Sequence, residues 1–182
     1  LSGVSVEIAA GERVGVAGRT GAGKSTLALA AAGFIPRVVR AKLGGRVEIE
    51  AVEAATAAAR KGADAVLFPE CATTGYAMDF GSLKPSAVDQ ALNAISQLAA
   101  DLRVQLLVGS PIFRSGRLYN ALLVFNRSGR LVHAYSKCQL TPADRQWFSA
   151  GEDISLFELD GIPASTFICH ERRYPELPRI SA

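Results

Sequence analysis

The sequence predicts an α/β fold with a mixed sheet, and three observations support this prediction. Short apolar segments alternate with amphipathic helical segments from residue 52 onward. The tetrapeptide NRSG at 126–129 lies between two segments of strand character, which is typical of a β-hairpin. A glycine-rich loop between a short apolar segment and a helical segment precedes them, within residues 13–32. Strands that alternate with helices and then form a hairpin indicate an α/β architecture.

Turn residues, helix caps and hydrophobic periodicity predict the elements up to residue 103. Residues 13–18 predict a short strand and residues 24–32 a helix, and residues 34–45 mark a boundary because they combine a proline with three basic residues. Residues 52–61 predict a helix that Gly62 closes as its C-cap. Residues 65–68 predict a buried strand. Residues 86–103 predict a helix with Ser86 as N-cap and one apolar face, formed by Val88, Leu92, Ile95, Leu98 and Leu102.

The remaining elements are mostly strands. Apolar segments predict strands at 104–108, 118–126, 130–137, 156–159 and 164–169. The dipeptide Asp160-Gly161 predicts a turn between the last two. A final helix is expected to start near Pro175, because proline is favoured in the first turn of a helix.

Composition excludes several classes of protein. Of 182 residues, 49% are hydrophobic and 20% charged, as in a globular protein with a core, and no run of 18 apolar residues predicts a membrane span. Residues 1–50 hold seven Lys or Arg and four Asp or Glu, and the remainder holds 13 of each, so the net charge of +3 is too small and scattered to indicate nucleic acid binding. Three cysteines without metal-ligand spacing, and no signal peptide pattern, indicate a reduced cytoplasmic protein.

The sequence GRTGAGKST at 18–26 fits the phosphate-binding pattern G-x-x-x-x-G-K-[ST]. Its glycines let backbone N–H groups turn toward phosphate oxygens, the lysine reaches the terminal phosphates, and the serine is the magnesium ligand. The alternative is a glycine-rich turn that matches by chance. The predicted phosphate-binding residues are Gly18, Gly21, Gly23, Lys24, Ser25 and Thr26.

Residues 1–47 as a whole resemble the start of an ABC-transporter ATPase subunit. The resemblance rests on LSGVS at 1–5, AGE at 10–12 and GRTGAGKSTLALAAAGFIP at 18–36. The later elements of such subunits, which are the glutamine loop, the LSGGQ-type signature and the Walker B carboxylates, do not follow. We therefore expect at most weak magnesium–ATP binding and no ATP hydrolysis from this segment.

Three further segments place an acid, a base and a thiol at predicted strand ends. Glu70 follows the strand at 65–68, Lys137 ends the hairpin, and Cys169 ends the last strand before a predicted helix. Ligands of open α/β sheets bind at such ends, and a thiol near a helix N-terminus and cations is expected to ionise more easily. Each residue has a structural alternative: a surface glutamate, a solvated lysine and a buried cysteine.

Together these segments resemble the nitrilase, or carbon–nitrogen hydrolase, superfamily. The motifs are FPE with GY four residues on at 68–76, YSKCQL at 135–140 and C-x5-PE at 169–176. The resemblance implies Cys169 as nucleophile, Glu70 as general base and Lys137 as the cation that stabilises the oxyanion. Asp144 stands where many members have a second glutamate, which implies a supporting role. No cofactor or metal is implied for the hydrolase.

Other residues near these motifs are predicted to be structural. His170 would point away from Cys169, because neighbouring residues of a strand face opposite sides. His133 is interpreted as a strand-face residue, and Cys71 and Cys138 as packing thiols.

The predicted organisation is therefore a Walker A fragment at 1–47, followed at 48–182 by the first half of a nitrilase-like αββα sandwich. The expected function is hydrolysis of a non-peptide carbon–nitrogen bond in a small amide, carbamoyl compound or nitrile. The alternative is a nucleotide-binding fragment of an ABC transporter ATPase. If the chain lacks the second half of the sandwich, an uncovered sheet face is expected to impair activity and to favour homo-oligomers.

Overall fold

The structure is a computed structural model that describes residues 47–76 and 79–181. The predicted phosphate-binding residues Gly18, Gly21, Gly23, Lys24, Ser25 and Thr26 lie outside the described residues. The described elements are, in order, α2 (Val47–Arg60), β1 (Ala65–Leu67), η1 (Phe80–Ser82), α3 (Pro85–Leu102), β2 (Gln105–Arg114), β3 (Arg117–Phe125), β4 (Leu131–Ser136), η2 (Asp144–Gln146), β5 (Phe157–Leu159), β6 (Ile162–Ala164), η3 (Cys169–Arg173) and α4 (Glu176–Ser181).

The main sheet is mixed, as predicted, and its strand order is β1-β2-β3-β4. β1 runs parallel to β2, with Val66 opposite Leu106, because α3 returns the chain to the start of the sheet. β2, β3 and β4 are joined by hairpins and pair antiparallel. Strands β5 and β6 form a separate two-stranded sheet.

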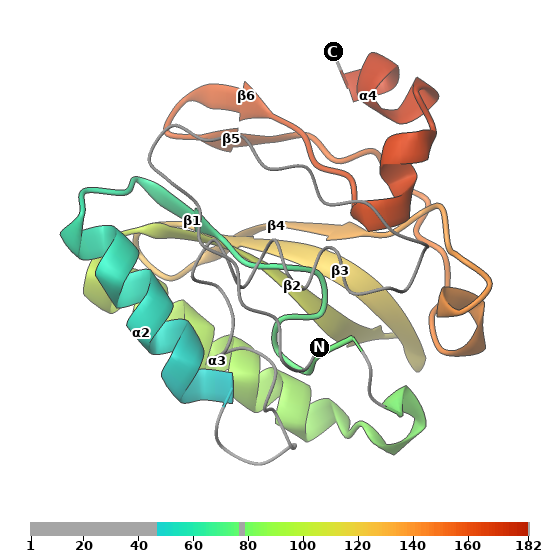
Figure 1. Cartoon of the computed structure of the whole chain (residues 1–182), viewed down its shortest axis with the longest axis horizontal. Coiled ribbons are helices and arrows are strands. Elements are labelled where there is room, and N and C mark those ends of the chain that lie inside the picture. The colour runs from blue at the N-terminus through green and yellow to red at the C-terminus, as the bar shows by residue number, and fades with distance from the viewer. Residues whose placement is uncertain (1–46, 77–78, 182) are drawn as a thin grey trace, which may run out of the picture. The chain divides into compact units, whose positions relative to one another are not determined.

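The sheet has a different cover on each face (Figure 1). On one face α2 and α3 pack on alternate strand residues, and Ala55, Ala99, Leu106 and Leu123 lie in this cluster. On the other face Leu107, Leu122 and Val124 form a second cluster, against which Phe157 of β5 packs. Successive residues of a strand face opposite sides, so neighbours such as Leu106 and Leu107 belong to different clusters.

Most turns follow the sequence prediction. Gly62 has φ +82°, the left-handed conformation expected of the residue that closes α2. The turn at 126–129 joins β3 to β4, and its Asn126 side-chain oxygen accepts hydrogen bonds from the backbone N–H groups of Ser128 and Arg130. Among the residues that the structure describes, no helix is both long and apolar enough to span a membrane.

Three predictions about individual elements were wrong. The N-cap of α3 is Lys84 and not Ser86, because Pro85 occupies the first turn, where its missing N–H costs nothing. The second strand continues to Arg114, since Ser115 and Gly116 both have positive φ and make a tight hairpin turn. The first strand is not buried: Leu67 is 67% exposed, on the face of this edge strand away from the helices.

The strand predicted at 164–169 is also absent. β6 ends at Ala164, and Cys169 begins the short 3-10 helix η3. The Ile168 N–H donates to the carboxylate of Glu171 (2.6 Å) and not to a neighbouring strand. The Ile168 N–H thus bonds to a side chain and not to a strand carbonyl. The segment before Cys169 is therefore irregular and is not part of a sheet.

Candidate active site

Glu70 lies in a turn that follows β1 directly. The Phe68 N–H still donates to the Leu107 carbonyl (2.8 Å), after which the chain turns, with the Gly75 N–H bonded to the Cys71 carbonyl (2.7 Å). This turn crosses β2 at Gly109. A Cβ atom on Gly109 would meet the Pro69 carbonyl oxygen and would lie 2.7 Å from Glu70 Cα. Glycine is therefore required at residue 109 for the Glu70 turn to rest on the sheet.

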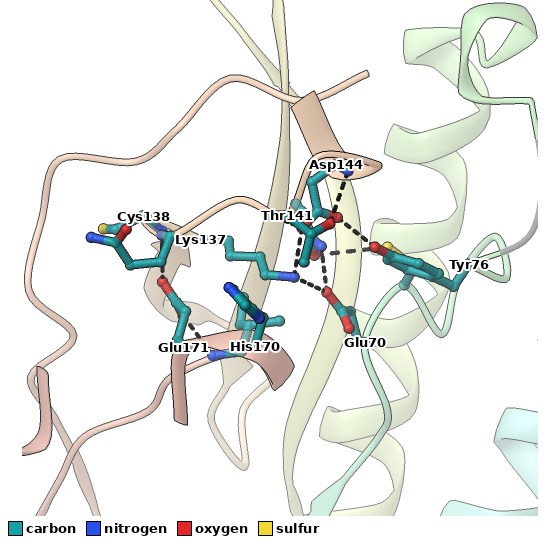
Figure 2. Close-up of polar contacts among 12 residues, drawn as sticks. Glu70, Tyr76, Lys137, Cys138, Thr141, Asp144, His170 and Glu171 are labelled. Atoms are coloured by element: carbon teal, nitrogen blue, oxygen red, sulfur yellow. Dashed lines mark hydrogen bonds and ion pairs between the residues drawn. The ribbon is translucent and has the colours of Figure 1, made fainter. Parts of the chain in front are cut away.

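Lys137 follows β4, and its backbone is held on both sides. Its N–H donates to the Asn120 carbonyl (2.8 Å), and its carbonyl accepts from the Gly151 N–H (2.9 Å). Its side chain is fully buried, and the ammonium lies 2.7 Å from Glu70 Oε1 and 3.0 Å from Asp144 Oδ2. Figure 2 shows the Lys137 ammonium between these two carboxylates. The structure thus brings Glu70, Lys137 and Asp144 into direct contact.

The buried charges stabilise one another. Burial alone would lower the pKa of Lys137, but hydrogen bonds and charge attraction from Glu70 and Asp144 outweigh it and raise that pKa. Burial alone would raise the pKa of Asp144, but hydrogen bonds from Tyr76, Thr141 and Lys137 hold it below its ordinary value. At neutral pH Lys137 is therefore a cation and Asp144 a carboxylate.

Polar neighbours orient both carboxylates (Figure 2). The Asn120 amide donates to Glu70 Oε1 (2.7 Å). The Tyr76 hydroxyl donates to Asp144 Oδ1 (2.5 Å), and the Thr141 N–H donates to Asp144 Oδ2 (2.8 Å). Burial and the bond to Asp144 raise the pKa of Tyr76, so the phenol stays a donor. Rigid outer contacts of this kind fix a site geometry before a substrate binds.

Cys169 differs from the other site residues in its setting. It begins η3 with φ +52° and is exposed. Its pKa is raised, first by partial burial of the thiol and then by the charge and a hydrogen bond of Glu70, while Lys137 and Arg172 act in the opposite direction. The expected easier ionisation was therefore wrong. The Glu70 carboxylate opposes formation of a thiolate, and η3 is too short to supply a helix dipole.

The secondary candidates have structural contacts. The argument that placed His170 on the opposite strand face was wrong, because Cys169 and His170 both lie in η3; the His170 ring nitrogen lies 3.2 Å from the Tyr174 hydroxyl. His133 stacks on Phe157. The Cys71 thiol is fully buried beside Phe80, and the Cys138 thiol donates to the Asp153 carbonyl.

Sequence reasoning missed the polar residues that surround the site. Tyr76 stands at the end of a quoted motif, and Asn120, Thr141 and Glu171 were given no role. Glu171 is fully buried and accepts four hydrogen bonds. Its place two residues after Cys169 is the one sequence feature that could have indicated a role near the site. In the described ranges no group of three or more His, Cys, Asp or Glu side chains could hold a metal ion.

Known proteins resemble this chain in sequence and in fold. The family model for carbon-nitrogen hydrolases matches residues 47–182. A 2-oxoglutaramate amidase of Bacillus subtilis is 32% identical over 122 residues, covering 64% of this chain and 46% of the relative. The crystal structure of an amidase from Nesterenkonia sp. has a TM-score of 0.69 at 24% identity and covers 74% of this chain and 53% of the amidase. The chain thus spans about half the length of these two proteins.

A short resemblance to an ABC transporter is also found. The multidrug resistance protein mrp-7 of Caenorhabditis elegans is 49% identical over 53 residues, which are 29% of this chain and 3% of the transporter. A match this short does not establish membership of the transporter family. The family model, in contrast, covers all the described elements, and the chain belongs to the carbon-nitrogen hydrolase family, the nitrilase superfamily.

Proposed function

We propose that this chain hydrolyses the carbon–nitrogen bond of a small amide, with Cys169 as nucleophile, Glu70 as general base, Lys137 as oxyanion-stabilising cation and Asp144 as its support. The observation that supports this most directly is the buried Lys137 ammonium, held 2.7 Å from Glu70 and 3.0 Å from Asp144. A fixed cation in a water-poor site stabilises negative charge that develops during reaction. Family membership agrees with this chemistry.

The reaction would proceed in two halves. Glu70 takes the proton of the Cys169 thiol as the sulfur attacks the amide carbon, and the carbonyl oxygen becomes an oxyanion beside Lys137. The tetrahedral intermediate collapses, the carbon–nitrogen bond breaks, and Glu70 returns the proton to the departing ammonia. Water then attacks the thioester with Glu70 again as base, which releases a carboxylic acid and the free thiol.

The raised pKa of Cys169 is consistent with this division of labour. A thiol that stays protonated at rest needs a base nearby, and after burial the Glu70 carboxylate is the largest cause of the raised pKa of that thiol. Proton transfer and attack would then occur together. As Glu70 takes up the proton, the negative charge moves from its carboxylate to the oxyanion of the substrate. The Lys137 cation then stabilises the transition state more than the resting state.

The substrate class is drawn from the relatives. The similar amidase structures include complexes with acrylamide and with butyramide, and one relative is named for 2-oxoglutaramate. Small primary amides are therefore the first substrates to test, with carbamoyl compounds and nitriles after them. The sheet with α2 and α3 would form one half of the αββα sandwich of such enzymes.

Ammonia release tests the proposal. The full chain would be incubated with butyramide and 2-oxoglutaramate, beside Cys169→Ala and the exposed-site control Lys61→Met. We expect ammonia from the wild-type chain and from the control but not from Cys169→Ala, which lacks the nucleophile. Equal rates in Cys169→Ala, or no ammonia from any small amide or nitrile with a folded chain, would reject the function.

The phosphate-loop sequence favours a second candidate function, weak magnesium–ATP binding by residues 18–26. Its support is the motif with Lys24 and Ser25, together with the short match to mrp-7. Calorimetric titration with magnesium–ATP, compared with Lys24→Ala, tests this candidate independently of amide hydrolysis. Equal heats of binding in the two chains would reject it.

A further inference from the structure

The carboxylate of Glu171 is buried next to the proposed active site, and in the described structure it forms no ion pair with the charged groups of that site. Glu171 is fully buried, and its Oε1 accepts from the Cys138 N–H (2.7 Å), the Gln139 N–H (3.0 Å) and the Tyr135 hydroxyl (2.8 Å). Its Oε2 accepts from the Ile168 N–H (2.6 Å). The ion pairs of Lys137, by contrast, are with Glu70 and Asp144.

These donors belong to the two segments that carry the reacting groups. Cys138 and Gln139 follow Lys137 directly, and Ile168 directly precedes Cys169. In the sequence, Cys138 and Gln139 lie 33 and 32 residues before Glu171, whereas Ile168 lies only three residues before it. One carboxylate therefore links the backbone beside the proposed cation to the backbone beside the proposed nucleophile. Figure 2 shows Glu171 beside Cys138 on the first of these sides.

A carboxylate suits this position better than any neutral side chain. All four contacts require an acceptor, and an ionised carboxylate has only acceptors to offer. Hydrogen bonds to a charged acceptor are shorter and stronger than those to a neutral one. Without Glu171 the Ile168 N–H, which the sheet does not satisfy, would lose its acceptor in a buried segment, and such unpaired groups are costly.

We propose that Glu171 is a positioning residue for the proposed amide hydrolysis: by holding the backbone next to Lys137 and next to Cys169, it sets the distance between the cation and the thiol. The inference rests on the proposed function for its kinetic consequence. The reacting atoms would be touched by Glu70, Lys137 and Cys169, while Glu171 acts through the main chain. A displacement of about 1 Å in such a site can cost about a hundredfold in rate.

Two substitutions weaken the hydrogen bonds of Glu171 to different extents, one at the carboxylate itself and one at a donor. Glu171→Gln keeps the shape of the side chain but turns an amide N–H toward at least one of the four donors, which loosens one of the two segments. Tyr135→Phe keeps the carboxylate and its three backbone bonds, and removes only the hydroxyl bond. The matched control is Glu158→Gln, because Glu158 is an exposed acid on β5.

The experiment measures kcat and KM for butyramide and the pH profile of Cys169 alkylation by iodoacetamide, followed on the Cys169 peptide by mass spectrometry. For Glu171→Gln we expect kcat to fall about a hundredfold with KM little changed. We also expect the midpoint of alkylation to move to lower pH, because the thiol moves away from the Glu70 carboxylate. Tyr135→Phe should change both readouts in the same direction by less, and Glu158→Gln should change neither.

The outcomes distinguish this inference from the proposed function. If Glu171→Gln melts at a lower temperature but keeps the wild-type kcat and alkylation profile well below that temperature, Glu171 is only structural and the inference fails. If no chain hydrolyses an amide but the alkylation midpoint of Glu171→Gln still shifts, the proposed function fails and the positioning of Cys169 stands. If Glu171→Gln does not fold, Tyr135→Phe decides, and an unchanged kcat and alkylation profile in that variant overturns the inference.

Discussion

The two sides of the proposed active site are built in different ways. On one side Lys137 and Asp144 are buried, and Lys137 follows a strand of the main sheet. On the other side Cys169 is exposed and begins a five-residue 3-10 helix that belongs to neither sheet. The charged groups are thus part of the core, whereas the thiol lies on a segment anchored to that core by side-chain hydrogen bonds.

This difference follows from the chemistry of the groups. A buried charge is tolerated only when opposite charges and hydrogen bonds replace its lost hydration, so Lys137 needs two carboxylates and a rigid surrounding. A neutral thiol carries no such cost and has to remain accessible to a substrate. The charged side should therefore dominate stability, and the thiol side should dominate reactivity.

The largest expected effect tests this division through stability. Lys137→Met leaves the carboxylates of Glu70 and Asp144 facing each other without their cation, which we expect to cost about 3–5 kcal/mol of the free energy of unfolding. Cys169→Ala should change that free energy by less than about 0.5 kcal/mol, because the side chain is exposed. Urea unfolding followed by circular dichroism measures both.

The control for this comparison is Lys61→Met, which removes an exposed lysine near the end of α2 and should leave stability within about 0.5 kcal/mol of the wild type. Similar free energies of unfolding for Lys137→Met and Cys169→Ala would contradict the division. They would mean that the ion pairs of Lys137 add nothing beyond the cost of burying them.

A smaller effect is expected at Asp144, and it depends on pH. The pKa of Asp144 in the folded chain lies below its ordinary value of 3.8, so the ionised carboxylate stabilises the fold above that pH. This stabilisation is lost as the pH falls through the lower folded-state value. Asp144→Asn should therefore lower the free energy of unfolding by about 1.5–3 kcal/mol near neutral pH. The gap to the wild type should close as the solution is acidified below pH 3.8.

Thermal melting of both chains across the acidic range measures this gap. The Asp101→Asn variant is the control, because Asp101 is exposed at the end of α3 and bonds only to the Gln97 amide in the described structure. A gap between wild type and Asp144→Asn that stays constant into acid would show that shape, and not charge, makes Asp144 stabilising.

The same contrast explains which parts were predictable from the sequence. The turn after β1 and the end of β4 could be located because apolar runs and a hairpin turn mark them locally. The resemblance of the motifs, and not these positions alone, then selected Glu70 and Lys137. The segment before Cys169 has an equally apolar sequence but no neighbouring strand, so the predicted strand at 164–169 was wrong. Its partner is the Glu171 carboxylate, and long-range bonds such as those of Glu171 and Asn120 leave no periodic pattern in a sequence.

The smallest expected effect concerns Glu70, which belongs to both sides of the site. Its carboxylate pairs with Lys137 at 2.7 Å and also raises the pKa of the Cys169 thiol, after the larger contribution of burial. Glu70→Gln removes that negative charge and leaves Lys137 less neutralised, and both changes favour the thiolate. The pKa of Cys169 should therefore fall toward its ordinary value of 9.0.

Because the thiolate is the reactive form, each unit by which that pKa falls should raise the rate of Cys169 alkylation near neutral pH by about tenfold, less the lower intrinsic reactivity of a weaker base. Amide hydrolysis should move the opposite way, since the general base is gone. Stopped-time alkylation with iodoacetamide and an ammonia assay on the same preparation give the two rates, with Glu176→Gln, an exposed acid on α4, as the control.

A Glu70→Gln chain in which both rates fall together would mean that Glu70 only holds the site in shape. Opposite changes in the two rates are the result expected of a carboxylate that opposes the thiolate by its charge and also accepts the thiol proton as general base.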